Sequence, residues 1–104
     1  MKIILACAGG MSSGFVADAL KKEIEKDGIA DVVVEAMSDS KIKEEINKKA
    51  WDIVLLAPQV KFQSEKIKAL CGEKNIPVYD IEGTSYTMMG APKIYQDIKE
   101  ILSK

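Results

Sequence analysis

The residues most able to do chemistry in this chain of 104 residues are a cysteine and the small residues that follow it. Glycines let a backbone fold tightly and leave its N–H groups unobstructed, and such groups beside a helix N-terminus form a cradle for an anion. The same helix end favours the thiolate form of a cysteine placed next to it. The pattern predicts a nucleophile, Cys7, at the mouth of a phosphate-binding loop made of Ala8, Gly9, Gly10, Met11, Ser12, Ser13 and Gly14.

A structural interpretation of Cys7 stays open at this point. A glycine-rich loop is a weak motif by itself, and a free cysteine often behaves as a small apolar side chain. The same residues are therefore also consistent with a buried cysteine beside an ordinary strand-to-helix turn.

The composition excludes several classes of function. The chain has no histidine, and its 15 basic residues are all lysines, so histidine catalysis and arginine phosphate clamps are absent. A net charge of −1 without a long basic run argues against nucleic-acid binding. No apolar stretch is long enough for a bilayer, and the run before Cys7 is too short for a signal peptide. We therefore expect a cytoplasmic protein with unpaired thiols, and no metal or cofactor.

Apolar runs and helical spacings alternate along the whole chain and predict the elements that position Cys7. Strands are expected at 2–6, 31–37, 52–57 and 78–81, and each is followed by a stretch with helical spacing of its apolar residues. Ser64 is expected to cap the third helix and Gly72 to close it. The βαβαβαβα pattern predicts a single α/β domain over residues 1–104, a three-layer sandwich with a parallel sheet covered on both faces.

In such sheets ligands bind at the carboxyl ends of the strands. Four loops are expected there, at 7–14, 38–40, 58–63 and 82–90. Gln59 could hydrogen-bond a partner or the cradle, or remain a solvated loop side chain. Tyr86, with Met88 and Met89, could contact a partner or cover the sheet edge. Cys71 shares a helical face with Ile67, which indicates a structural thiol.

Two segments carry a resemblance to a known family. The segment from Cys7 to Ser13 resembles the phosphocysteine loop of the lactose/cellobiose/chitobiose family of enzyme IIB components of the bacterial sugar phosphotransferase system (PTS). The segment from Ile53 to Gln59 is similar to the family's third strand and its Pro-Gln exit. The resemblance extends to the element order and covers essentially the whole chain.

The resemblance implies a strand order of 2-1-3-4 and a role for the cysteine. Cys7 would take a phosphoryl group from a phosphohistidine of a separate IIA protein and pass it to a sugar bound by the membrane component IIC. The sugar would be a β-linked disaccharide such as cellobiose, chitobiose or lactose. The loop from Ala8 to Gly14 would bind the phosphate, although Gly14 replaces a residue that often carries a hydroxyl.

Two other functions compete with this one. A low-molecular-weight phosphatase uses a similar cysteine loop, but its arginine position is occupied by Ser13, and lysine does not reproduce the bidentate geometry of arginine. A non-catalytic anion-binding module would have the same fold and would tolerate Cys7→Ser.

Overall fold

The computed structural model describes residues 1–8 and 12–103, with the backbone alone at Ser12 and Ser13. The strands are β1 (Lys2–Cys7), β2 (Val33–Ser38), β3 (Ile53–Leu56) and β4 (Val78–Asp80), and the α-helices are α1 (Ser12–Lys26), α2 (Ile42–Lys48), α3 (Ser64–Gly72) and α4 (Ala91–Leu102). Short 3-10 helices are η1 (Asp39–Lys41), η2 (Pro58–Gln63), η3 (Gly83–Ser85) and η4 (Met88–Gly90).

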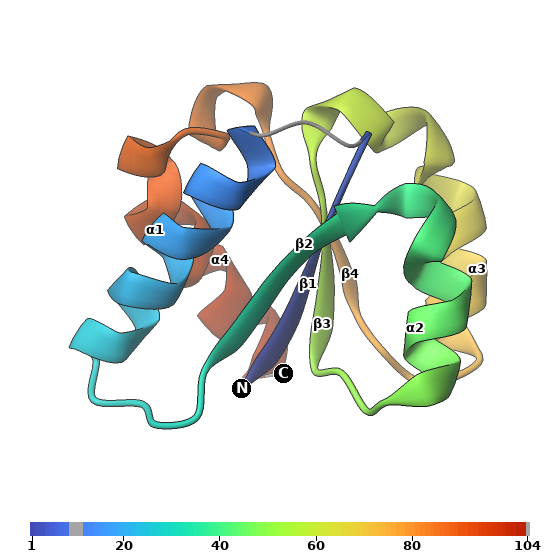
Figure 1. The fold of residues 1–104 in the computed structure, drawn as a ribbon, viewed down its shortest axis with the longest axis horizontal. Helices are drawn as coiled ribbons and strands as arrows, with labels where there is room; N and C mark the ends of the chain where they lie inside the picture. Colours follow the sequence, from blue (N-terminus) through green and yellow to red (C-terminus); the bar gives the residue numbers. More distant parts are fainter. Residues whose placement is uncertain (9–11, 104) are drawn as a thin grey trace.

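The four strands form one parallel sheet in the order β2-β1-β3-β4, which confirms the predicted architecture and strand order. Figure 1 shows α1 and α4 on one face of the sheet and α2 and α3 on the other. Each crossover returns the chain to the same end of the sheet, so all four strand-to-helix connections lie together at the upper edge of that view. No helix among the described residues is long and apolar enough to cross a bilayer.

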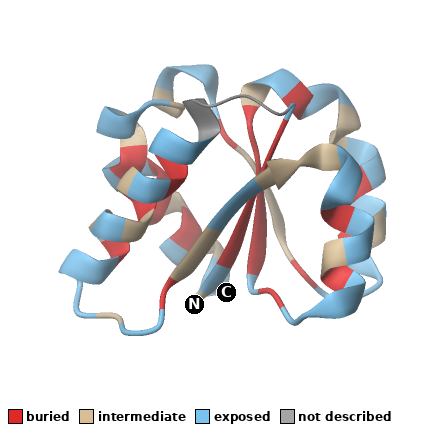
Figure 2. Ribbon diagram, in the orientation of Figure 1, coloured by how far each residue is buried: buried red, intermediate tan, exposed pale blue. Residues whose placement is uncertain are grey.

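The core consists of two layers because side chains alternate across the buried strands. Ile3 and Leu5 of β1 pack towards α1 and α4, whereas Ile4 and Ala6 pack towards α2 and α3. All four are fully buried, and Figure 2 shows β1 and β3 buried along most of their lengths. A continuous apolar run in the sequence is thus what a strand covered on both faces requires.

The predicted boundaries differ from the structure at a few points. β2 begins at Val33, two residues later than expected, since Asp31 takes a left-handed backbone conformation with φ of 57°. Ser64 is the first residue of α3 and does not cap it, because its hydroxyl donates to Asp80 instead. Gly72 is the last helical residue, as expected, but the left-handed residue that turns the chain is Asn75.

In Figure 1 the chain begins at the amino end of β1, and α4 finishes towards the same end of the sheet. The start of β1 and the end of α4 are therefore at the end of the sheet opposite the strand-to-helix connections. Met1 and Ile101 both pack against the core layer below α1 and α4, which agrees with this placement.

Tyr95 of α4 joins the last helix to the end of the first. Its hydroxyl donates a hydrogen bond of 2.7 Å to Oδ2 of Asp27, which follows α1. Burial, the hydrogen bond to Asp27 and the charge of that carboxylate raise the pKa of Tyr95 to about 12 from 10.0. The unfolded chain therefore loses this proton at lower pH than the folded chain, so stability falls as pH rises through this window.

We expect Tyr95→Phe to lower the free energy of unfolding by about 1 kcal/mol at neutral pH, because one hydrogen bond is lost. The difference from the wild type should shrink as pH rises from 10.0 to about 12, where the tyrosine would ionise. Urea unfolding over this pH range measures it. A difference that stays constant across the range would contradict the Tyr95–Asp27 hydrogen bond.

Candidate functional site

Cys7 is the last residue of β1, which is flanked by a strand on each side. Its register partner on β2 is Ser38. The side chain is buried, at 5% exposure, and its thiol donates to the backbone carbonyl of Met37 with a sulfur–oxygen distance of 3.4 Å. The structure therefore places the predicted nucleophile at the carboxyl end of the sheet, where parallel sheets bind their ligands.

Helix α1 starts at Ser12, five positions after Cys7. The N–H groups in the first turn of a helix have no acceptor within the helix, and the helix dipole makes this end attractive to anions. The first turn of α1 contains no acidic residue, and the sequence from Ile3 to Ala17 has no charged residue at all. A bound anion would meet no carboxylate from this segment.

The predicted cradle is only partly described. Gly9, Gly10 and Met11 lie outside the described residues, as do the side chains of Ser12 and Ser13. Ala8 is exposed directly after β1, and Gly14 is exposed within the first turns of α1. The roles predicted for the loop from Ala8 to Gly14 therefore stay predictions.

Tyr86 lies close to Cys7 although 79 positions separate them in the sequence. It follows η3 and packs against both core layers, so that it spans the end of the sheet. Burial raises the pKa of the Tyr86 hydroxyl, and the negative charge of a Cys7 thiolate raises it further. The phenol thus stays protonated and can act as a hydrogen-bond donor near the sulfur.

A cavity of about 350 Å³ lies at the same end of the molecule. It brings Gln59 from η2 together with Tyr86, so the two residues predicted as possible partner contacts do meet at one place. Most of the remaining lining is apolar. The full lining consists of Phe15, Val16, Gln59, Tyr86, Thr87 and Met88.

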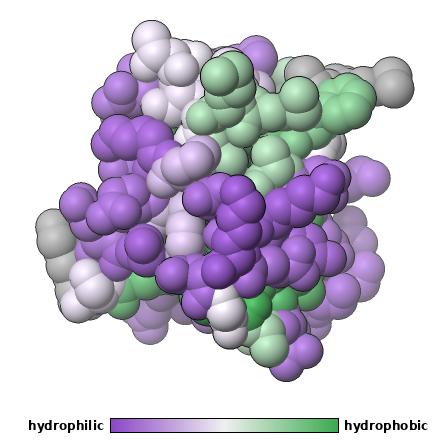
Figure 3. Space-filling view, turned by 90° about the vertical axis from the view of Figure 1, so that its left-hand side faces the viewer, coloured by the Kyte–Doolittle hydropathy of each residue, from purple (hydrophilic) through white to green (hydrophobic). Residues whose placement is uncertain are grey.

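Exposed apolar side chains gather around this cavity. Phe15 at the start of α1 is 60% exposed, and Met88 and Met89 before α4 are 58% and 92% exposed. Figure 3 shows hydrophobic residues gathered towards the upper right of this side of the molecule. Phe15 shares the helical spacing of Val16 and Leu20, but these two are buried whereas Phe15 is exposed. A large aromatic residue directly after the small-residue loop was the available signal.

Cys71 does not belong to this site. Its side chain is fully buried, with 0% exposure, and it packs with Ile67 in the core layer between the sheet and helices α2 and α3. Burial raises the pKa of its thiol. Neither cysteine is in a disulfide.

We expect iodoacetamide to leave Cys71 unmodified in the folded protein and to modify it once urea unfolds the chain, because a buried thiol of raised pKa supplies little thiolate. Peptide mapping measures this. Cys71→Ala should lower the free energy of unfolding by about 1 kcal/mol and leave the alkylation of Cys7 as it was. Equal alkylation of Cys71 in folded and unfolded protein would contradict its burial.

Comparison with known proteins gives one consistent result. The family model described as "PTS system, Lactose/Cellobiose specific IIB subunit" matches residues 2–97. An oligo-beta-mannoside-specific EIIB component of the PTS from Bacillus subtilis (strain 168) is 29% identical over 101 residues, which are 97% of this chain and 95% of the relative. A lactose-specific EIICB component from Streptococcus mutans is 36% identical over 84 residues. These are 81% of this chain but 14% of that longer protein.

Solved structures agree with the fold. The lactose-specific IIB domain from Streptococcus pneumoniae superposes with a TM-score of 0.83 at 20% identity, over 96% of this chain and 95% of that one. The cellobiose-specific IIB protein from Borrelia burgdorferi gives a TM-score of 0.69 at 29% identity, over 92% and 85%. With its sheet order and the match over residues 2–97, the chain belongs to the lactose/cellobiose-specific IIB subunits of the PTS, a family of phosphotransferase domains.

Proposed function

We propose that this chain is a phosphoryl carrier in which Cys7 accepts a phosphoryl group from the phosphohistidine of a IIA protein and donates it to a sugar held by IIC. The observation that carries the proposal is the position of Cys7 at the carboxyl end of β1, five positions before α1 begins. A helix N-terminus that follows so soon would stabilise a thiolate or a phosphoryl group at this end of the sheet.

The transfer consists of two displacements at phosphorus. In the first, the Cys7 sulfur attacks as the thiolate, the bond from phosphorus to the histidine nitrogen of IIA breaks, and that nitrogen takes up a proton as it leaves, which balances the proton given up by the thiol. In the second, a sugar hydroxyl oxygen attacks the same phosphorus, the sulfur–phosphorus bond breaks, and the thiolate leaves. The hydroxyl proton passes to solvent or to a base on the partner. Both steps transfer the phosphoryl group without any oxidation or reduction.

The residues around Cys7 suit a carrier that must not release phosphate to water. The chain contains no histidine to activate water and no arginine to clamp the transition state. Positioning and backbone electrostatics are the main sources of catalysis in phosphoryl transfer, and a partner can complete both. The Tyr86 hydroxyl would donate to an oxygen of the phosphoryl group, and the amide of Gln59 would approach it from the cavity side.

The proposed docking surface for the partners consists of the apolar patch of Phe15, Met88 and Met89 together with Gln59 and Tyr86. Exposed apolar groups beside a reactive residue are typical of protein contact sites. A partner seated there would exclude water from the phosphoryl group. An EIICB relative supports IIC as one of these partners, and the carrier would act on the cytoplasmic side of the membrane.

The proposed sugar class is a β-linked oligosaccharide such as cellobiose, chitobiose or lactose. Its support is that the named relatives are specific for oligo-β-mannosides, lactose or cellobiose. The choice among these sugars would be made by IIC, which holds the substrate.

The test is intact-mass measurement of the purified chain after incubation with a phosphorylated IIA protein of the lactose/cellobiose type. One phosphoryl group should be added, and it should be lost rapidly only when IIC and its sugar are supplied. Repeated turnover of an aryl phosphate by the chain alone, removed by Cys7→Ser, would make the chain a phosphatase. Absence of any phosphorylation would favour the anion-binding module.

A further inference from the structure

Asp80 is a charged residue in a place where the sheet is otherwise apolar. It ends β4, and its register partner is Leu56, which in turn pairs with Ala6 of β1. These three residues form one row across the sheet, and Cys7 comes directly after Ala6. Two strand spacings of about 4.8 Å place the Asp80 backbone about 10 Å from that of Ala6.

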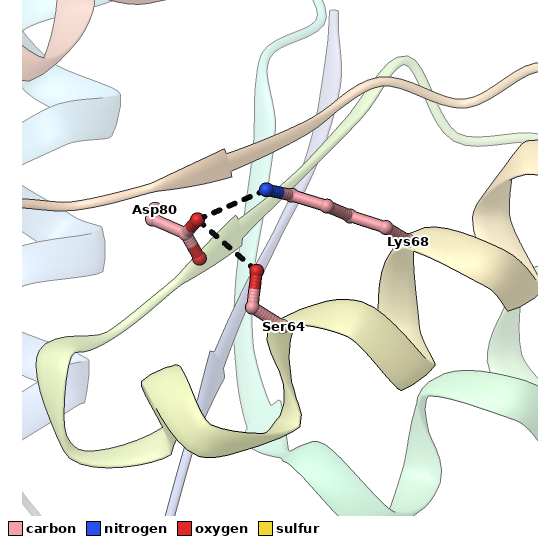
Figure 4. Close-up of polar contacts among 3 residues, drawn as sticks. All are labelled: Ser64, Lys68 and Asp80. Carbon is pink, nitrogen blue, oxygen red and sulfur yellow. Dashed lines mark hydrogen bonds and ion pairs between the residues drawn. The ribbon is translucent and has the colours of Figure 1, made fainter.

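One oxygen of Asp80 joins the end of β4 to the start of α3. Oδ2 accepts a hydrogen bond of 3.1 Å from the Ser64 hydroxyl and one of 3.2 Å from the Lys68 ammonium. Figure 4 shows both side chains converging on this oxygen from one helix. Gln63, at the N-cap position of α3, makes no side-chain cap, so the Asp80 carboxylate also supplies the negative charge that the helix N-terminus favours.

These contacts fix one end of η2, and β1 fixes the other. The amide of Ala57 donates a hydrogen bond of 2.9 Å to the carbonyl of Ala6, the residue before Cys7. From Ala57 the chain runs through η2 to Ser64. Gln59 lies between these two anchors and lines the cavity that Tyr86 shares. The Asp80 carboxylate therefore holds the carboxyl end of η2, the segment that contains Gln59, at Ser64.

Stability alone does not account for the carboxylate. The second oxygen, Oδ1, is buried and, within the described part of the chain, has no hydrogen-bond partner. A buried acceptor without a partner costs stability, so half of this carboxylate opposes folding. The bonded oxygen, Oδ2, instead holds Ser64 and with it the end of η2, which starts beside the Cys7 end of β1.

We propose that Asp80 is a positioning residue, which holds η2 and thereby Gln59 over the Cys7 end of the sheet through its bond to Ser64. Its effect on phosphoryl transfer rests on the proposed carrier function. Its effect on the position of η2 does not depend on that function, and the experiment measures the two effects separately.

The structural measurement is amide hydrogen exchange of Val60, whose N–H donates to the carbonyl of Ala57 within η2. Asp80→Ala and Ser64→Ala should each speed this exchange roughly tenfold, because a hydrogen bond to a charged group is lost. The Ala57 amide, anchored on β1, should keep its rate. Lys93→Met is the matched control, since it removes an ion pair of 2.8 Å with Asp97 in α4, away from η2. Unchanged Val60 exchange in both variants overturns the proposal.

The functional measurement is the rate of phosphoryl transfer from phosphorylated IIA, taken where circular dichroism shows every variant folded. Asp80→Ala should slow transfer roughly tenfold, and Asp80→Asn should recover most of the rate because its amide oxygen still accepts from Ser64. In a Gln59→Ala background Asp80→Ala should have no further effect, since Asp80 acts through that segment. Additive losses would overturn the positioning role even if Val60 exchange changed. If Asp80→Ala fails to fold, the result for Ser64→Ala decides in its place. If the wild type accepts no phosphate, the proposed carrier function fails, and the hydrogen exchange of Val60 alone tests the effect of Asp80 on η2.

Discussion

The Cys7→Ser protein should gain no phosphoryl group from phosphorylated IIA, while the wild type gains one per chain. A serine hydroxyl is far less acidic than a thiol, and the chain has no histidine that could act as its base. The variant should still fold, because a serine hydroxyl can donate to the Met37 carbonyl that the Cys7 thiol now uses. Intact-mass spectra before and after incubation measure the effect.

Cys71→Ala is the matched control for this experiment. It removes the other thiol, which is buried in the core layer below α2 and α3, and should accept phosphate as the wild type does. Full modification of Cys7→Ser would refute Cys7 as the acceptor, and loss of modification in folded Cys71→Ala would require both thiols.

Gly90→Ala should have the second largest effect, because the added methyl group has no room. A Cβ at this position would overlap the carbonyl oxygen of Ser85 and lie 2.7 Å from its carbonyl carbon. The amide of Gly90 also donates a hydrogen bond of 3.0 Å to the hydroxyl oxygen of Thr87. The turn from Ser85 to Thr87 must therefore move, which displaces Tyr86, at its centre, from its present position beside Cys7.

We expect Gly90→Ala to lower the free energy of unfolding by about 1–3 kcal/mol, as overpacking does. Phosphoryl transfer should fall by up to about a hundredfold, since a displacement of 1 Å at a reacting centre can cost that much. Thermal unfolding and transfer from IIA measure the two effects. Gly83→Ala is the control in the same loop, where a Cβ meets nothing within 4 Å. Equal effects of the two variants would show that crowding at Ser85 is not the cause.

Much of the fold could be predicted because the strands are buried on both faces. A run such as Ile53–Leu56 has no polar residue to confuse its interpretation, and the helices between the strands keep one apolar side. Cys7 was likewise predictable at the end of β1, since a strand followed by small residues and a helix has few other arrangements.

The rest of the site depends on contacts between residues far apart in the sequence, which no local sequence pattern predicts. The 3-10 turns η2 and η3 have no apolar period, so 58–63 and 82–90 could be predicted only as loops. Ser64 resembles a helix cap in sequence, but its partner Asp80 lies 16 residues away. The closeness of Tyr86 to Cys7 follows from the strand order, which brings the end of the chain's last loop over its first strand.

The placement of the chain ends sets how this domain can be joined to another. A tether attached before β1 or after α4 would start at the amino ends of the strands, so the Cys7 end of the sheet would remain open to an incoming protein. Such a tether must first run back along the sheet, about 20 Å for the six residues of β1. Once longer than that, it would raise the effective concentration of an attached acceptor and make the second displacement intramolecular.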